Sequence, residues 1–386
     1  MQILLLTNLY PPQELGGYGR SMADFAWGLK KLGNQIEVIC SDAPYLSINS
    51  KEKESDINRI LILKGSFENG VTNIQDINKR AEIDIYNIKM IKSILSKRKW
   101  DGILIGNIDL IGVEILPILI KSKIPILHHI GFIEPSFRAE EIPKSKNYIM
   151  VSASYAVRQS LIEKGFITPN HPVIYPGART ELFGENVTKR KLPKSPDGTE
   201  NNPLCIAFAG LLMSSKGLHT LVESIIKLKQ KGVSTRTFIA GDDFQKGYKE
   251  ALKSMLNEHN LQDSVLFTGS LSREKLSRFF CLNHVFVFPS IYPEAFGIVQ
   301  AEAMASKLAI LSTGVGGSKE MIQDGFNGFL FQSQNSNDLS KKLLNLIEKP
   351  ELIKQFGINS QKKVITNFST IESAKKLESI FLKMSN

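Results

Sequence analysis

Cysteine is scarce in this chain: three residues, at positions 40, 205 and 281, are spread over 386. They show no CxxC or Cys-His spacing, so the sequence supports neither a disulfide framework nor a zinc site. Long apolar runs are also missing, because Glu114 and Pro117 interrupt the best candidate for a membrane span, residues 110–120. The start, "MQILLLTNLYPP", lacks the basic residues and cleavage site of a signal peptide, and we expect it to form a buried strand. These absences favour a cytoplasmic location.

The formal net charge of +10 leaves nucleic acid, an anionic membrane or an anionic small substrate as partners. Residues 1–185 carry 22 Lys+Arg against 20 Asp+Glu, and residues 186–386 carry 26 against 18, so most of the excess lies in the second half. No basic stripe interleaved with aromatic residues occurs, which argues against nucleic acid. Residues 79–99 hold seven basic and two acidic residues in a helical pattern. A solvated helix face explains them, and peripheral contact with the inner face of a membrane is the alternative.

Short apolar runs rich in β-formers alternate with helical patterns along the chain. The first half contains "QILLLT", "IEVIC", "RILILK", "GILIG", "IPILHH" and "YIMVSA"; the second contains "LCIAFAG", "TRTFIAG", "SVLFTG", "VFVFP", "LAILST" and "GFLF". This alternation predicts an α/β fold with βαβ units and parallel sheets. We expect two doubly wound, Rossmann-like domains, residues 1–185 and 204–370, with a linker at 186–203. The apolar spacing in 371–386 predicts a terminal helix that packs back on the N-terminal domain.

Both halves begin with a strand, a glycine-bearing turn and a helix. In "NLYPPQELGGYGR", Gly16 and Gly17 would let the backbone approach a ligand at the start of a helix near Tyr18; an ordinary tight turn is the alternative. In "AGLLMSSKG", Lys216 places an ammonium group beside a helix N-terminus, which suits a phosphate. A solvated surface lysine is the alternative there.

Two carboxylates stand out in "SIYPEAFGIVQAEAMASK". We expect Glu294 in the loop after "HVFVFP", a helix that begins near Phe296 or Gly297, and Glu302 on that helix, facing the crevice at the carboxyl ends of the strands. Eight helical residues span about 12 Å, so the two groups cannot form a close acid/base dyad. The backbone amides of Phe296, Gly297 and Ile298 would meet a phosphate, and the carboxylates would accept hydrogen bonds from hydroxyl groups on either side. An acidic first turn favoured by the helix dipole would explain Glu294 but not Glu302.

Residues 289–331, "PSIYPEAFGIVQAEAMASKLAILSTGVGGSKEMIQDGFNGFLF", resemble the E-x7-E signature and following glycine-rich loop of the retaining GT-B glycosyltransferases of family 4. Flanking pieces agree in order over nearly the whole chain: "YPPQELGGYGRSMADFAWGLKKLG", "VIYPGARTELF", "AGLLMSSKG" and "VLFTGSL". The resemblance implies the GT-B fold, in which two Rossmann-like domains face a central cleft. It also implies transfer with retention of anomeric configuration, a nucleotide-diphosphate sugar as donor substrate, and no metal or other cofactor.

The family pattern also implies roles for the matching positions. Glu294 would contact the hydroxyl groups of the donor sugar near the reaction centre, and Glu302 would hold the nucleotide ribose. Lys216 would bind the diphosphate, helped by the amides of residues 296–298 and by the glycine loop of residues 16–17. In similar enzymes the departing phosphate helps to deprotonate the acceptor, so stabilising the leaving diphosphate is the main catalytic task.

The chain departs from the family pattern at two positions. Leu211 stands where the family commonly has an arginine that clamps the diphosphate, and Arg179 or Arg20 would have to substitute for it. The family also has a histidine after the "IP" strand that contacts the donor sugar, and its expected position is Gly131. His129, slightly earlier, is the residue we expect to make this contact; a structural histidine with satisfied hydrogen bonds is the alternative.

The sequence therefore predicts a hexosyltransferase that acts on an acceptor bound by the first domain: a lipid, an oligosaccharide or a small metabolite. The long, charged loop of residues 131–147 is placed to line the acceptor site. Because the arginine is missing at Leu211, a degenerate protein that only binds a nucleotide sugar is an alternative. A GT-B sugar-nucleotide epimerase is a further alternative, against which the E-x7-E spacing argues.

Overall fold

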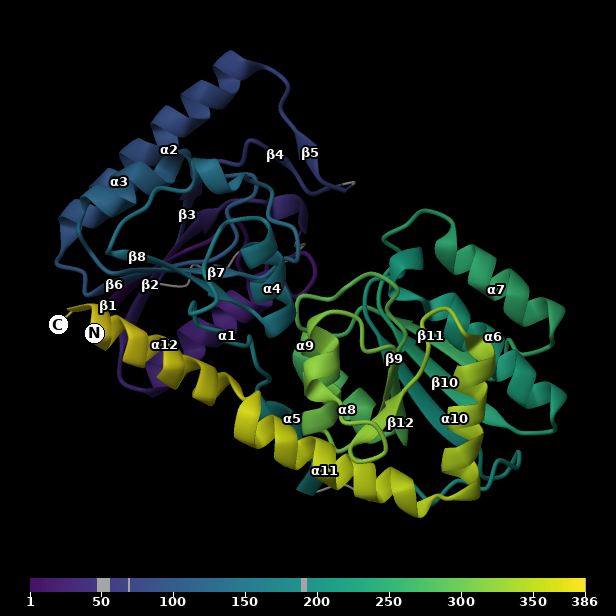
Figure 1. The fold of residues 1–386 in the computed structure, drawn as a ribbon. Helices are drawn as coiled ribbons and strands as arrows, with labels where there is room; N and C mark the ends of the chain where they lie inside the picture. Colours follow the sequence, from purple (N-terminus) through teal and green to yellow (C-terminus); the bar gives the residue numbers. More distant parts are fainter. Residues whose placement is uncertain (47–55, 69, 189–192, 386) are drawn as a thin grey trace. The chain divides into compact units, whose positions relative to one another are not determined.

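The chain folds into two compact units in the computed structural model, which describes residues 1–46, 56–68, 70–188 and 193–385 (Figure 1). Unit 1 comprises Met1–Pro176 and Thr370–Asn386, and unit 2 comprises Gly177–Ser369. Each unit contains one six-stranded sheet in which every neighbouring pair of strands is parallel. These are the two doubly wound α/β sheets that the alternating pattern predicts.

The sheet of unit 1 has the strand order β3-β2-β1-β6-β7-β8. Its strands are β1 (Gln2–Leu6), β2 (Gln35–Ser41), β3 (Ile57–Leu61), β6 (Gly102–Ile105), β7 (Ile126–Ile130) and β8 (Tyr148–Ser152). The helices of this unit are α1 (Tyr18–Lys31), α2 (Ile77–Lys97), α3 (Leu116–Lys121), α4 (Tyr155–Glu163) and α12 (Thr370–Ser385), with short 3-10 turns η1 (Pro44–Leu46), η2 (Val113–Ile115) and η3 (Ala139–Glu141). A small antiparallel pair, β4 (Gly65–Ser66) and β5 (Thr72–Asn73), completes it.

Unit 2 repeats this architecture with the order β11-β10-β9-β12-β13-β14. Its strands are β9 (Leu204–Ala209), β10 (Thr235–Ala240), β11 (Val265–Gly269), β12 (Val285–Phe288), β13 (Ala309–Ser312) and β14 (Gly328–Leu330). Its helices are α5 (Thr180–Thr188), α6 (Leu218–Gln230), α7 (Tyr248–Glu258), α8 (Arg273–Cys281), α9 (Ile298–Ala305), α10 (Ser336–Glu348) and α11 (Glu351–Asn367), with 3-10 turns η4 (Ser214–Lys216) and η5 (Gly317–Met321).

Each of the twelve short runs predicted as strands overlaps a strand of these two sheets. The central strands are buried on both faces, because helices cover both sides of a parallel sheet, and this is why they read as continuous apolar runs. In both sheets the chain starts with a central strand, β1 or β9, and later crosses to its other side through β6 or β12. In such sheets ligands bind beyond the carboxyl ends of the strands near this reversal.

The boundary between the units differs from the prediction. It lies between Pro176 and Gly177 rather than at residue 185, because α5 belongs to unit 2. Ser277 of α8 donates a hydrogen bond to the backbone oxygen of Leu182 in α5, at 3.0 Å, so the helix is tied to this unit. Of the predicted linker at 186–203, residues 189–192 lie outside the described part, and residues 193–203 also belong to unit 2.

The last helix, α12, lies alongside α1 in unit 1 (Figure 1). The two backbones approach closely at Gly28, where an added Cβ would lie 2.8 Å from the Cβ of Ala374. Phe381 is fully buried and lies over Gly102 of β6, where an added Cβ would be 2.7 Å from its ring. Small residues on α1 and β6 therefore make room for an apolar face of α12.

We expect the substitution Phe381→Ala to lower the free energy of unfolding of unit 1 by about 3–5 kcal/mol, because it removes a fully buried aromatic ring and leaves a cavity. Leu382→Ala is the matched control: this neighbouring side chain is 51% exposed, and its loss should change stability by no more than about 0.5 kcal/mol. Denaturant unfolding measures both, and equal stability of the two variants would contradict the packing of α12.

Candidate functional site

Lys216 and Glu294 meet at the carboxyl ends of two neighbouring strands of unit 2. Lys216 ends η4, which follows β9, and Glu294 lies in the loop after β12. The Lys216 Nζ lies 2.6 Å from Oε1 of Glu294, and Ser290 donates a second hydrogen bond to the same oxygen. Both charged side chains are partly exposed, at 30% and 16%. The structure thus brings together two of the residues that the sequence singled out from segments far apart.

Backbone contacts fix the loop that carries Glu294. The backbone N–H of Gly317 donates to the oxygen of Glu294 at 2.7 Å, and Glu294 donates to Val315 at 3.3 Å. Gly316 has a φ of +65°, and a Cβ at this position would overlap the backbone of Glu294. Only glycine therefore fits between these two contacts, which gives the "GVGG" stretch a structural reason.

The helix α9 begins at Ile298, directly after this loop. Gly297 is its N-cap residue, with a φ of +98°, and no side chain caps the helix end. Its first amides therefore point toward the loop of Glu294 without a side-chain acceptor, which is the arrangement that binds anions. Phe296 is buried, with its ring centroid 5.9 Å from that of Phe368, and holds the turn in place. The prediction that the helix begins near Phe296 or Gly297 and that Glu294 precedes it is confirmed.

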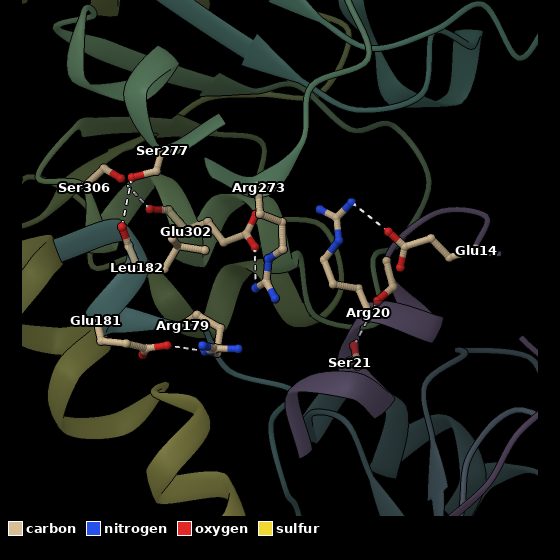
Figure 2. A network of polar contacts seen from close by, with 11 residues as sticks. Glu14, Arg20, Ser21, Arg179, Glu181, Leu182, Arg273, Ser277, Glu302 and Ser306 are labelled. Carbon is tan, nitrogen blue, oxygen red and sulfur yellow. Dashed lines mark hydrogen bonds and ion pairs between the residues drawn. The ribbon is translucent and has the colours of Figure 1, made fainter. Parts of the chain in front are cut away.

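Glu302 lies on α9 as predicted, but its side chain is fully buried. One carboxylate oxygen, Oε1, accepts a hydrogen bond from Arg273 of α8 at 2.9 Å (Figure 2). The other, Oε2, has no hydrogen-bond partner among the residues that the structure describes. The expectation that Glu302 faces an open crevice therefore needs correction, because α8 supplies a guanidinium group that covers this face of α9.

Sequence reasoning missed Arg273. It is separated from Glu302 by 29 residues, and no spacing rule connects the two positions. The only local signal is "SREK", in which Ser272 caps α8 through the backbone N–H of Lys275 and so sets the first helical residue at Arg273. The guanidinium group also lies 5.8 Å from the ring centroid of Phe183 in α5, so three helices meet at this ion pair.

The two arginines considered as substitutes at the diphosphate are both held in ion pairs (Figure 2). Arg179 pairs with Glu181 in unit 2, and Arg20 pairs with Glu14 in unit 1, at 3.2 Å. Leu211 follows Gly210 at the end of β9 and is half-buried. Both pairs are partly exposed, so a substitution by Arg179 or Arg20 stays a prediction.

Gly16 and Gly17 lie in unit 1, between β1 and α1. Gly16 has a φ of +67°, and Gly17 is the N-cap residue of α1, which no side chain caps. Both are exposed, in the loop that follows the carboxyl end of β1. Their geometry suits a backbone that approaches a ligand, and their part in donor binding stays a prediction.

The side chain of His129 is not exposed at the carboxyl edge of the unit 1 sheet. It is on β7, is fully buried, and its ring packs edge-on against Phe25 at 4.9 Å between centroids. Its Nε2 lies 2.9 Å from the backbone oxygen of Ile174, which can only accept, so Nε2 carries the proton. The prediction that His129 contacts a donor sugar is corrected: side chains alternate along a strand, and this one faces the core.

Tyr18 fills the space beside Gly131 that the family pattern assigns to a histidine. A Cβ at Gly131 would overlap the Tyr18 ring, which also stacks on Phe132 at 5.3 Å between centroids. The Tyr18 hydroxyl donates to the backbone oxygen of His129. Burial raises the pKa of Tyr18, and the charge of Asp109 raises it further, so the phenol stays protonated.

Two absences concern only the part of the chain that the structure describes. No three His, Cys, Asp or Glu residues in these ranges come together as a group that could hold a metal ion. None of the helices there is both long and apolar enough to cross a membrane.

On α2, Lys79, Lys89 and Lys92 are exposed, as is Ile85 at 69%. Membrane contact through residues 79–99 stays a prediction.

Comparison with known proteins agrees with this geometry. Residues 191–363 match the family described as glycosyl transferases group 1. An uncharacterized glycosyltransferase of Methanocaldococcus jannaschii is 24% identical over 280 residues, which span 72% of this chain and 69% of that protein. A second one from the same organism is 33% identical over 154 residues, or 40% of this chain and 41% of that protein.

Solved structures agree in fold over the whole chain. A glycosyltransferase of Rickettsia africae has a TM-score of 0.78 at 21% identity, with 99% of this chain and 98% of that chain covered. HepE of Anabaena, crystallised with UDP and glucose, has a TM-score of 0.74 at 17% identity, with 99% and 100% covered. The chain is a glycosyltransferase, and its residues 191–363 match the group 1 family. Both units of this glycosyltransferase together form the GT-B fold.

We expect Arg273→Met to lower the free energy of unfolding of the glycosyltransferase by about 3–5 kcal/mol, because it leaves the buried carboxylate of Glu302 without its cation. The double variant Arg273→Met/Glu302→Met should recover most of this loss, since replacing both partners of a buried pair is often neutral. Arg278→Met, at an exposed position of the same helix, is the control. Denaturant unfolding checks the series, and a double variant less stable than Arg273→Met would refute the expectation.

The buried histidines predict an acid-sensitive stability. Burial lowers the pKa of His128 to about 3 and that of His129 to about 4. In the unfolded chain both titrate at about pH 6.5, so below this pH the unfolded state binds more protons than the folded state. The stability is therefore complete above about pH 6.5 and falls by about 2 kcal/mol for each histidine by about pH 5.

Urea unfolding followed between about pH 7 and about pH 5 measures this slope. His129→Gln keeps a donor for the oxygen of Ile174 and should remove roughly half of the slope. A stability that does not change over this range would show that the imidazoles are not held neutral by burial.

Proposed function

We propose that this glycosyltransferase transfers a hexose from a nucleotide-diphosphate sugar to an acceptor, with retention of anomeric configuration. The observation that carries the proposal is the cluster of Lys216, Ser290 and Glu294 next to the uncapped start of α9. It combines a cation, anion-binding amides and a carboxylate at the carboxyl ends of two neighbouring strands. A ligand that joins a phosphate to a hydroxyl-bearing ring satisfies all three.

Relatives of the chain support a nucleotide sugar as donor. HepE of Anabaena was crystallised with UDP and glucose and with UDP-glucose. A capsular polysaccharide biosynthesis glycosyltransferase of Staphylococcus aureus, CapM, is 24% identical over 62% of this chain. An α-D-kanosaminyltransferase of Streptomyces kanamyceticus is 24% identical over 48% of it. The sugars and acceptors named for these proteins differ, so the reaction class rather than one substrate is carried over.

The proposed roles follow from the chemistry of each group. Lys216 and the amides of residues 296–298 bind the diphosphate and stabilise the charge that develops as it leaves. Glu294 accepts hydrogen bonds from the hydroxyl groups of the sugar once Lys216 turns to the diphosphate. Glu302 takes the ribose only once Arg273 moves off this face of α9, because its carboxylate is fully buried in the unliganded unit. We keep for Gly16 and Gly17 the part in donor binding that the family pattern implies, and we propose no metal or other cofactor.

Leu211 supports one alternative, a degenerate protein that binds a nucleotide sugar without turning it over. It places an aliphatic side chain where a second cation is expected, so less positive charge faces the leaving diphosphate. The two functions share a binding site and differ in catalysis. Binding and the release of free nucleotide must therefore be measured separately.

We expect one of a panel of UDP-, GDP- and ADP-sugars to raise the melting temperature by a few degrees, because a ligand at about 100 times its Kd stabilises the folded state by about 2.7 kcal/mol. Lys216→Ala should weaken binding by roughly ten- to a hundred-fold, since it removes a charge-assisted contact. Glu302→Ala should also weaken binding. Lys253→Ala, at an exposed position of α7, is the matched control and should bind as the wild type does.

Release of the free nucleoside diphosphate, with water or a sugar as acceptor, then separates the alternatives. Stabilisation with turnover that is lost in Lys216→Ala supports the transferase. Stabilisation without turnover in the presence of many acceptors favours the degenerate binding protein. If no nucleotide sugar stabilises the wild type, the proposed donor class is wrong.

A further inference from the structure

A depression of about 370 Å³ lies at one edge of the unit 1 sheet, and the roles proposed above do not use it. Asp42 follows β2 directly, and Ile62 and Leu63 follow β3, so the depression opens at the carboxyl ends of these two strands. Ligands of open parallel sheets bind at this end of the strands. The volume falls within the range of roughly 300–1,000 Å³ that is usual for small-molecule pockets.

A buried polar network holds the charged wall of the depression. Gln13 is 1% exposed and donates through Nε2 to Oδ1 of Asp42 at 2.8 Å, while its Oε1 accepts from the backbone N–H of Ala43 at 2.7 Å. Arg59 donates to Gln13 at 3.3 Å. A carboxylate offers about four acceptor sites, so Asp42 keeps capacity for further donors after its bond to Gln13.

The rest of the lining is aromatic and aliphatic. Tyr45, Ile62 and Tyr86 line the depression and are 42%, 43% and 39% exposed. Asn87, which is fully buried, exchanges two hydrogen bonds of 2.9 Å with the backbone of Ile62 and so fixes α2 against the end of β3. The hydroxyl group of Tyr45 accepts from the backbone N–H of Phe67 at 3.1 Å. The exposed rings are therefore held in place rather than free to collapse onto one another.

The charges of the described lining residues disfavour an anionic ligand. Among the described residues that line the depression, the cation is Arg59, and it directs its guanidinium group to the backbone oxygens of Tyr10 and Pro11, at 3.1 and 2.7 Å, and to Gln13. These bonds occupy Nη1 and one hydrogen of Nη2, so less of the guanidinium group is left for a phosphate or carboxylate. Asp42 adds negative charge, which disfavours an anion further. Acceptor oxygens and aromatic rings in one depression suit a ring that has hydroxyl groups on its rim and apolar C–H groups on its faces.

We propose that this depression binds the sugar ring of the acceptor, and that Asp42, Tyr45 and Tyr86 make it selective for a neutral pyranoside. Asp42 accepts hydrogen bonds from ring hydroxyl groups, and the tyrosine rings pack against the apolar face of the ring. The inference rests on the proposed glycosyl transfer, and it names the class of acceptor for it. An oligosaccharide or a glycoside fits this site, whereas a phosphorylated metabolite does not.

The test is saturation-transfer NMR on the full-length protein with methyl α-D-glucopyranoside, methyl α-D-mannopyranoside and methyl β-D-galactopyranoside as probes. We expect saturation transfer to the ring protons of at least one glycoside. Asp42→Asn keeps the acceptor for Gln13 but removes the charge, and it should weaken binding by roughly tenfold. Tyr86→Ala should weaken it to a similar degree. Tyr155→Ala, an exposed tyrosine of α4, is the matched control and should bind as the wild type does.

Donor binding is measured in parallel, so that this inference and the proposed function fail separately. Asp42→Asn and Tyr86→Ala should be stabilised by the nucleotide sugar as much as the wild type is. If no glycoside binds, or if binding is unchanged in both variants, the inference is overturned even when the donor binds. Stronger saturation transfer to glucose 6-phosphate than to the methyl glycoside would also overturn it. Glycoside binding that depends on Asp42 and Tyr86, without binding of any nucleotide sugar, would support the sugar site and refute the donor proposal.

Discussion

Glu294 is held by a loop that passes so close to its backbone that only glycine fits at position 316. The contact sets the direction in which the chain leaves β12 and therefore where α9 begins. It also brings the carboxylate to Lys216, which arrives from the end of β9 on the neighbouring strand. Because three segments far apart in sequence converge through this one close approach, the cation, the carboxylate and the helix start have fixed relative positions within unit 2.

The fold could be predicted because its signals are local. Apolar runs of strand length, separated by helical patterns, are the direct result of a sheet that is buried on both faces. The start of α9 could be predicted for the same reason, since Gly297 and the helical pattern after it are neighbours in the sequence. The boundary between the units could not, because α5 is assigned to unit 2 by contacts such as that of Ser277 with Leu182, which no local pattern encodes.

The same difference between local signals and tertiary contacts separates the site residues that could be predicted from those that could not. Lys216 and Glu294 stand at strand ends, where the sheet itself brings them together. The burial of Glu302 depends on Arg273 of another helix, and the burial of His129 depends on which face of β7 meets α1. Both depend on tertiary packing, which no local sequence pattern shows. A pattern can place a residue on an element, but the side chain's exposure is decided by what packs against that element.

Tyr18 and Gly131 show how a departure from a family pattern can be compensated. A side chain at position 131 and the ring of Tyr18 need the same space, so the glycine is required by the tyrosine rather than by its own backbone angles. The hydroxyl group of Tyr18 is bound to the backbone oxygen of His129. The end of β7 therefore presents a protonated phenol instead of an imidazole. Its one proton is donated to that backbone oxygen, and the phenol keeps this form across the pH range in which a histidine would change charge.

The ion pair of Lys216 and Glu294 affects how far the absence of an arginine at position 211 would weaken the proposed donor binding. Both charged groups are partly exposed, so their attraction contributes only about 0–1 kcal/mol and is easily exchanged for another partner. A diphosphate carries more charge than one carboxylate and can use the uncapped amides of α9 at the same time. In the proposed donor complex, binding would therefore release Glu294 at little expense in free energy. The missing arginine would reduce the number of contacts to the diphosphate, and the helix start and Lys216 would supply the contacts that remain.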